Sequence, residues 1–304
     1  MENALCVKET AERIADMRIR GAGRIARSAA LALGEMASGF KGAELSDFKS
    51  KLELSAAELV ATRPTAVSLS NAVGLVVRSA AKAGTVDEAR ESVTRAASDF
   101  ARASETAVKR LAVVAAAKVP KGARVLTHCN SSAAVAAIIR AHQNGGVEAF
   151  CTETRPWRQG RITARELAAA GVPVTLVVDS SAGLLMPDID IVLVGADTVE
   201  WDGSLLNKVG TSQLACAAAR NSVPFVCCAE SYKFAPPSQA GKRREIELRS
   251  ADEVLDGAEL PDVKVWNPVF DRTVPGLINS YATEHGEVAP AGALDFARKH
   301  LEGL

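Results

Sequence analysis

The chain has 304 residues, 48% of them hydrophobic, and its 36 Lys and Arg residues balance its 36 Asp and Glu residues. This length allows one large or two ordinary domains, and the balanced charge excludes the broad basic surface that nucleic-acid binding needs. No apolar run reaches the length of a membrane span and the first residues carry no signal-peptide pattern, so we expect a cytoplasmic protein with no nucleic-acid or membrane partner. The six cysteines form no C-x-x-C pair and zinc-ligand spacing is absent, so we predict no metal site.

The first part of the chain reads as a series of helices. Thr85 or Asp87 can cap the last of them, and Gly84 ends the one before it. We therefore predict a helical N-terminal domain over residues 1–118. Apolar residues recur three and four positions apart in the segments 9–20, 22–37, 55–63, 65–84 and 85–118.

Beyond residue 118 the period of the pattern changes. Runs of β-branched residues alternate with helical stretches such as 162–171, in which Thr163 and Glu166 match a capping box and Gly171 supplies a stop. This alternation implies right-handed crossovers and a parallel sheet covered on both faces. We therefore predict an α/β fold, with a helical N-terminal domain followed by a Rossmann-like parallel-sheet domain over residues 119–304. The predicted strands are 123–129, 147–153, 172–179, 189–197, 223–229 and 263–267.

Two of the predicted strands end at a reactive side chain, Cys129 and Asp197. Open α/β sheets bind ligands at the carboxyl edge of the sheet, so a thiol and a carboxyl group there suggest proton transfer on a small molecule. Asn130, Ser131 and Ser132 follow the cysteine and resemble helix caps, which would place the thiol beside a helix N-terminus that lowers its pKa. Burial of Asp197 would raise its pKa and suit it to general acid catalysis. The alternatives are a buried strand cysteine and a helix-cap or turn aspartate.

Polar and cationic residues near these strand ends favour a phosphorylated ligand. Asn207 and Lys208 precede a glycine-led helix start. The segment Arg20–Gly23 combines an arginine with two glycines, and Arg63 precedes a proline at a helix start. Both arginines suit an anion, although Gly-Ala-Gly also breaks helices and Arg63 also suits a solvated position. Lys233 follows a further strand end, and the lack of a G-x-G-x-x-G motif after the first strand argues against a dinucleotide cofactor.

The order of these motifs resembles one known superfamily. It contains the regulatory subunits of eukaryotic translation initiation factor 2B, methylthioribose-1-phosphate isomerase and archaeal ribose-1,5-bisphosphate isomerase. The resemblance spans nearly the whole chain. The similar segments are "IRGAG", "RPTAVSLSNAV", "THCNSSA", "TETRPWRQGRITARELAAAGVPVTLVVDSSAG", "VGADTVEWDGSLLNKVGT", "SYKF" and "NPVFDRT". The chain length, "THCNSSA" and "SYKF" resemble the ribose-1,5-bisphosphate enzyme more than the methylthioribose enzyme.

The resemblance implies an isomerase that converts α-D-ribose 1,5-bisphosphate to ribulose 1,5-bisphosphate in nucleoside or AMP salvage. Cys129 and Asp197 match the catalytic pair of the isomerase members, which the initiation-factor subunits generally lack. Asp197 would protonate the ring oxygen and Cys129 would take the C2 proton, although the reverse assignment and a hydride shift stay open. The alternatives are a non-catalytic regulatory or binding subunit and a methylthioribose-1-phosphate isomerase.

The resemblance also implies a binding site and an assembly. It implies a sugar bisphosphate substrate, no redox cofactor, no metal, and a homodimer or homohexamer. The implied substrate-binding residues are Arg20, Gly21, Ala22, Gly23, Arg63, Ser131, Ser132, Asn207, Lys208 and Lys233.

Overall fold

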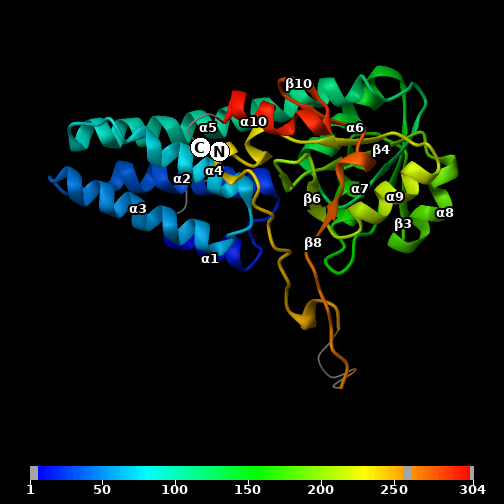
Figure 1. Ribbon diagram of the computed structural model, residues 1–304, viewed down its shortest axis with the longest axis horizontal. Coiled ribbons are helices and arrows are strands. Elements are labelled where there is room, and N and C mark those ends of the chain that lie inside the picture. Colours follow the sequence, from blue (N-terminus) through cyan, green and yellow to red (C-terminus); the bar gives the residue numbers. More distant parts are fainter. Residues whose placement is uncertain (1–5, 256–259, 261, 302–304) are drawn as a thin grey trace. The chain divides into compact units, whose positions relative to one another are not determined.

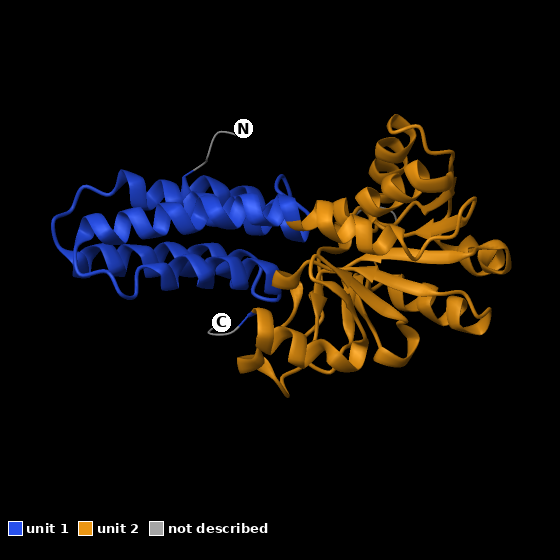
Figure 2. Cartoon of the chain, turned by 90° about the horizontal axis from the view of Figure 1, so that it is seen from above, with its two compact units in different colours: residues 1–106, 301–304 blue, residues 107–300 orange. Residues whose placement is uncertain are grey.

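The computed structural model describes residues 6–255, 260 and 262–301, and the chain divides into two compact units. Unit 1 comprises Met1–Thr106 and Leu301–Leu304, and unit 2 comprises Ala107–His300 (Figure 2). Each unit buries apolar side chains of its own. No helix in the described part of the chain has the length and apolar composition of a membrane span.

Unit 1 consists of helices whose apolar residues recur at helical spacing and face its interior. Leu33 and Phe48 are completely buried there. Thr85 caps α5, because its hydroxyl accepts a hydrogen bond from the Glu88 N–H at 3.2 Å while the Glu88 carboxylate accepts one from the Gly84 N–H at 2.8 Å. The helices are α1 (Val7–Ala15), α2 (Ala22–Gly39), α3 (Leu45–Thr62), α4 (Val67–Ser79) and α5 (Val86–Ala116), the last of which continues into unit 2 (Figure 1).

The described part of unit 2 contains two β-sheets. The larger has the order β10-β9-β7-β4-β1-β2-β3, and its neighbouring strands are parallel except for β10 and β9. The smaller has the order β5-β6-β8 and is antiparallel. The strands are β1 (Arg124–Thr127), β2 (Glu148–Thr152), β3 (Val174–Val177), β4 (Ile191–Gly195), β5 (Thr198–Val199), β6 (Leu205–Lys208), β7 (Phe225–Cys228), β8 (Phe270–Thr273), β9 (Ser280–Thr283) and β10 (Gly286–Val288) (Figure 1).

Helices connect the parallel strands of the larger sheet, as right-handed crossovers require. Helix α6 follows β1, α7 follows β2, and α9 follows the small hairpin of β5 and β6. A helical N-terminal region followed by a mostly parallel sheet confirms the predicted fold class. The α-helices of unit 2 after α5 are α6 (Ser132–Gly145), α7 (Gly160–Ala169), α8 (Ala182–Leu185), α9 (Thr211–Arg220) and α10 (Ala293–His300).

The order in which the chain adds strands to the larger sheet reverses at β1. From β1 the chain adds β2 and β3 on one side, and then places β4 on the other side of β1. Val125 pairs with Ile191 and Leu126 with Val192, so the two strands run in the same direction and end at the same edge. Such a switch point is where open α/β sheets bind their ligands.

Two predicted elements differ from the structure. The predicted strand 263–267 is wrong, because these residues form no strand and Trp266 is 77% exposed. The strand of this region is β8, which begins at Phe270 and pairs with β6. An apolar run predicts a strand only where a partner strand and a core face receive it. The predicted helix 55–63 is the second half of α3, which begins at Leu45.

Candidate active site

Strands β1 and β4 deliver the two reactive side chains to the switch point. Cys129 and Asp197 each follow the end of their strand by two residues. Ser131 caps α6, because its hydroxyl accepts a hydrogen bond from the Ala134 N–H at 3.3 Å. A Cβ on Gly195 would overlap this hydroxyl. The glycine at the end of β4 therefore lets the start of α6 approach the strand that leads to Asp197.

The Cys129 thiol interacts with the charges of Asp197 and Lys208. Burial raises the pKa of the thiol to about 11, the positive charge of Lys208 lowers it, and the negative charge of Asp197 raises it. The prediction that the helix start gives this thiol a lowered pKa is wrong. The Asn130 N–H does lower the pKa, but desolvation of the thiolate outweighs that interaction. The thiol of the free protein is therefore protonated at neutral pH.

Lys208 supplies positive charge to the site. It is buried at the end of β6, and its ammonium group lies 5.4 Å from the centre of the Phe270 ring. The side-chain amide of Asn207 donates to the Thr211 hydroxyl at 3.0 Å, and this hydroxyl donates to the Lys208 carbonyl at 2.6 Å. These two hydrogen bonds fix the turn between β6 and α9, so the position of Lys208 is set by the backbone of that turn.

The N-terminus of α9 already holds an anionic side chain of the protein. Asp271 on β8 accepts hydrogen bonds from the N–H groups of Gly210 at 2.7 Å and Ser212 at 3.1 Å. Burial raises the pKa of Asp271 to about 6, and these hydrogen bonds offset part of that rise. Contrary to the sequence analysis, this helix start does not offer these two N–H groups to a phosphate.

Lys233 lies just beyond the end of β7 and is paired with an acid. Its ammonium group is 2.6 Å from the Glu230 carboxylate, and both side chains are buried. Burial lowers the pKa of Lys233, but the charge of Glu230, its hydrogen bond and the charge of Asp197 outweigh that effect and raise the pKa overall. The Tyr232 hydroxyl donates to the other Glu230 oxygen at 3.0 Å. Lys233 is therefore charged, within electrostatic range of Asp197, and partly neutralised by its partner.

The predicted residues of unit 1 lie at the starts of α2 and α4. Gly21 has a φ of +88°, a backbone conformation that favours glycine, and immediately precedes α2. The Ser68 hydroxyl donates to the Ala22 carbonyl at 3.2 Å, which joins the segment Arg20–Gly23 to the start of α4. Arg63 is buried between α3 and α4. That these residues share a ligand with the predicted residues of unit 2 stays a prediction.

Comparisons with known proteins agree with this set of motifs. The family model of the initiation factor 2 subunit family matches residues 18–290. The chain belongs to this family. The ribose 1,5-bisphosphate isomerase of Methanocaldococcus jannaschii is 41% identical over 300 residues, which cover 98% of this chain and 96% of that protein. The methylthioribose-1-phosphate isomerase of Gemmatimonas aurantiaca is 37% identical over 305 residues, which cover 96% of this chain and 88% of that protein. The solved structure of translation initiation factor eIF-2B from Pyrococcus horikoshii OT3 has a TM-score of 0.81 and 29% identity, and the match covers 93% of this chain and 97% of that chain.

In this member of the initiation factor 2 subunit family, several polar residues around the thiol were missed by the sequence analysis. The Cys129 sulfur lies 3.5 Å from the side-chain oxygen of Gln159, the residue before α7. Thr163 and Glu166 do not form a capping box, because α7 begins three residues before Thr163. Both side chains instead accept hydrogen bonds from the Asn130 amide at 3.0 Å, and the Thr163 hydroxyl donates to the Cys129 carbonyl at 2.8 Å.

The imidazole of His128 is held as one neutral tautomer. Its Nε2 lies 2.8 Å from the Val209 carbonyl, which only accepts, so Nε2 carries the proton and Nδ1 accepts from the Thr152 hydroxyl at 2.6 Å. Burial lowers the pKa of His128, which keeps the ring neutral. His128 therefore connects the end of β1 to the turn that follows Lys208.

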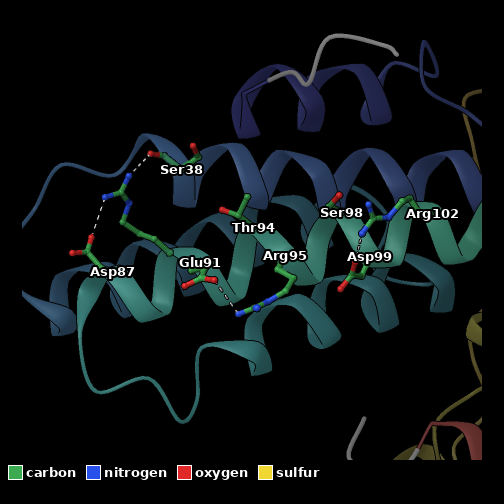
Figure 3. Close-up of a pocket in the computed structure, with 9 residues that line it drawn as sticks. Ser38, Asp87, Glu91, Thr94, Arg95, Ser98, Asp99 and Arg102 are labelled. Atoms are coloured by element: carbon green, nitrogen blue, oxygen red, sulfur yellow. Dashed lines mark hydrogen bonds and ion pairs between the residues drawn. The ribbon is translucent and has the colours of Figure 1, made fainter.

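Unit 1 has a charged surface groove of about 530 Å³ (Figure 3). Three arginines of α5 line it, and each forms an ion pair with an acid one turn away on the same helix, so its charges are balanced. The groove is lined by Ser38, Asp87, Arg90, Glu91, Thr94, Arg95, Ser98, Asp99 and Arg102, none of which is a predicted site residue.

No three His, Cys, Asp or Glu side chains in the described chain come together as metal ligands.

Proposed function

We propose that this protein is a sugar-phosphate isomerase that converts α-D-ribose 1,5-bisphosphate to ribulose 1,5-bisphosphate. The observation that carries the proposal is that Asp197 and Lys208 both act electrostatically on the thiol of Cys129. A thiol and a carboxyl group provide two groups for proton transfer, and an ammonium group binds phosphate. The identity of 41% to the M. jannaschii ribose 1,5-bisphosphate isomerase, over almost the whole of both chains, supports this substrate.

The proposed chemistry divides the proton transfers between the two side chains. The substrate carries phosphate on C1, so its ring does not open spontaneously to an aldehyde. Asp197 gives a proton to the ring oxygen as the bond from C1 to that oxygen breaks, and Cys129 removes the proton from C2. The C–H electron pair forms a double bond between C1 and C2. The resulting enol phosphate becomes the C2 ketone when the C2 hydroxyl gives its proton back to the Asp197 carboxylate and C1 gains a proton from the Cys129 thiol.

The pKa of Cys129 constrains this assignment. With a pKa of about 11, the thiol must lose its own proton before it can act as a base, and the positive charge of Lys208 favours that loss. A hydride shift from C2 to C1 would need no thiolate. Substrate deuterated at C2 separates the routes: proton transfer to Cys129 releases deuterium to water, whereas a hydride shift retains it at C1.

Two phosphates need two sets of donors. We propose that cationic side chains bind them, with hydroxyl, amide and backbone N–H groups completing the contacts. If Lys233 binds the second phosphate, Lys233→Ala weakens the binding of a bisphosphate much more than that of a monophosphate; equal weakening would contradict this role. The proposed residues are Arg20, Gly21, Ala22, Gly23, Arg63, Ser131, Ser132, Asn207, Lys208 and Lys233.

A methylthioribose-1-phosphate isomerase is a second candidate, because a relative of that name is 37% identical to this chain. Such an enzyme would need an apolar pocket for the methylthio group in place of a second phosphate site. A regulatory subunit would bind a sugar phosphate without converting it, in line with the structural similarity to translation initiation factor eIF-2B.

Phosphorus NMR of purified protein with ribose 1,5-bisphosphate tests the proposal. We expect the wild type to form ribulose 1,5-bisphosphate, and Cys129→Ser and Asp197→Asn each to lose about 10²–10⁴-fold in kcat while binding is retained, as general acid–base groups do. Binding by the wild type without conversion would contradict the isomerase and favour the regulatory subunit.

We also propose that the protein is cytoplasmic and forms a homodimer or homohexamer. Light scattering after size-exclusion chromatography measures the mass of the assembly directly. A mass equal to that of one 31.8 kDa chain at micromolar concentration would contradict the oligomer.

A further inference from the structure

Cys129 has an unusual backbone conformation for a residue with a side chain. Its φ is +67°, in the left-handed region that glycine prefers. For other residues this region costs about 1–2 kcal/mol, and such residues persist where the surroundings hold them. A residue at this position that relaxed to an ordinary conformation would redirect its Cα–Cβ bond, and with it the thiol.

Two threonine hydroxyls hold the main chain of Cys129 from either side. The Thr154 hydroxyl accepts a hydrogen bond from the Cys129 N–H at 2.9 Å, and the Thr163 hydroxyl donates to the Cys129 carbonyl at 2.8 Å. Both threonines are buried, at 0% and 1% exposure. Thr154 lies just beyond β2 and Thr163 lies in α7, so the neighbouring strand and its helix fix the cysteine together.

Each hydroxyl has a further hydrogen-bond partner. The Thr154 proton has acceptors in the Thr152 carbonyl at 3.3 Å, the Thr152 hydroxyl at 3.4 Å and His128 Nδ1 at 3.5 Å, and each of them leaves the Thr154 lone pairs for the Cys129 N–H. Thr163 accepts from the Asn130 amide at 3.0 Å, which leaves its proton for the Cys129 carbonyl. Each hydroxyl therefore has a partner for its proton and a partner for its lone pairs.

Thr154 is itself held in place by an acid just beyond the end of β3. Its φ is +64°, and its N–H donates to one Asp179 oxygen at 2.7 Å, while the Arg155 N–H donates to the other at 2.8 Å. The carboxylate therefore stabilises a second left-handed residue, whose hydroxyl in turn holds Cys129.

We propose that Thr154 and Thr163 are positioning residues that keep Cys129 in its left-handed conformation and so aim its thiol at the C2 proton of the substrate. The aim at C2 rests on the proposed isomerase activity. In a merely structural role, these hydroxyls would only satisfy the buried polar groups of the backbone. The two roles differ in the property of the protein that changes when the hydroxyls are removed.

Substitutions that remove or keep the hydroxyl test this proposal. Thr154→Val and Thr163→Val preserve side-chain shape and remove the hydrogen bond, whereas Thr→Ser at the same positions keeps it. Thr273→Val is the matched control, because Thr273 is a buried threonine of the same unit whose hydroxyl has no partner in the described structure. Two measurements apply to each variant: kcat and KM for ribose 1,5-bisphosphate, and the pH profile of Cys129 alkylation by iodoacetamide without substrate, resolved by peptide mass spectrometry.

We expect both valine variants to lose about 10–100-fold in kcat with KM changed less than threefold, because a small misplacement of a reacting group has effects of this size. Their alkylation profiles should shift, while the serine variants and Thr273→Val stay within about threefold of the wild type in kcat. An unchanged alkylation profile and kcat in the valine variants would overturn the proposal. A loss of kcat equal to the loss of folded protein, measured by circular dichroism, would also overturn the proposal. Serine variants that lose as much kcat as the valine variants would overturn it too.

The alkylation measurement separates this proposal from the proposed function. If the wild type converts no ribose 1,5-bisphosphate, the isomerase is wrong, while the shift in alkylation still shows that the threonines control the thiol. If the wild type is active and the valine variants keep the wild-type profile and kcat, the positioning role alone is wrong.

Discussion

The raised pKa of Cys129 predicts a slow reaction with alkylating reagents. A pKa of about 11, against 9.0 for an unperturbed thiol, leaves about 0.1% thiolate at pH 8 instead of about 10%. Because the thiolate is the reacting species, Cys129 should be alkylated about 100-fold more slowly than an ordinary thiol at this pH. Cys216 is free and exposed in the same unit and serves as the internal reference.

Two substitutions test the electrostatic cause of this slow reaction. Lys208→Met removes a positive charge that lowers the pKa, so Cys129 should react more slowly still. Asp197→Asn removes a negative charge that raises the pKa, so Cys129 should react faster. Iodoacetamide labelling between pH 7 and 10, followed by peptide mass spectrometry, gives the alkylation rates of Cys129 and Cys216 in the wild type and in each variant. A Cys129 rate equal to that of Cys216 at pH 8 would contradict the raised pKa, and a faster reaction in Lys208→Met or a slower one in Asp197→Asn would contradict its electrostatic cause.

The remaining predictions concern stability and are measured by thermal and urea unfolding. Gly160→Ala should lower the free energy of unfolding by about 1–3 kcal/mol, because a Cβ there would overlap the Thr152 carbonyl oxygen at the end of β2. Gly183→Ala is the control and should not lower it, because a Cβ at Gly183 meets open space. Relative to Asp271→Asn, the free energy of unfolding of the wild type should rise by about 1.4 kcal/mol as the pH falls from 7.5 to 5. The cause is that Asp271 takes up a proton with a pKa of about 6 in the folded protein and only near 3.8 in the unfolded chain. A constant difference between the two proteins over this range would contradict the burial of that acid. Arg272→Leu should cost about 3–5 kcal/mol, because it leaves Glu200, which is 2% exposed, without its two hydrogen bonds from the guanidinium; a cost below about 1 kcal/mol would contradict a buried ion pair.

The strand ends at the switch point were accessible from the sequence. An apolar run such as residues 191–195 is buried on both faces of a parallel sheet, so the first carboxylate after it, Asp197, must leave the core at the carboxyl edge. The same reasoning applies to Cys129. Small and polar residues after each strand then indicate the helix starts that bring ligand-binding groups to that edge.

The contacts that tune the site were not accessible in the same way. Asp271 and Gly210 are 61 positions apart in the chain, and no local pattern indicates that the carboxylate of one meets the N–H of the other. Thr163 and Glu166 match a capping box in sequence, but the helix begins earlier, because a glycine there allows the chain to pass close to β2. The pKa of Cys129 depends on how many groups surround the thiol, which the order of residues does not determine.

A competition assay between the two candidate substrates tests whether this protein is a ribose 1,5-bisphosphate isomerase. Wild-type protein is given equal concentrations of ribose 1,5-bisphosphate and methylthioribose 1-phosphate, and both are followed in one sample by phosphorus NMR, with Cys129→Ser as the control. We expect the bisphosphate to be converted to ribulose 1,5-bisphosphate before the methylthio sugar is consumed, and the variant to convert the bisphosphate at least about 100-fold more slowly than the wild type. Consumption of the methylthio sugar first, or of neither by the wild type, would contradict this expectation.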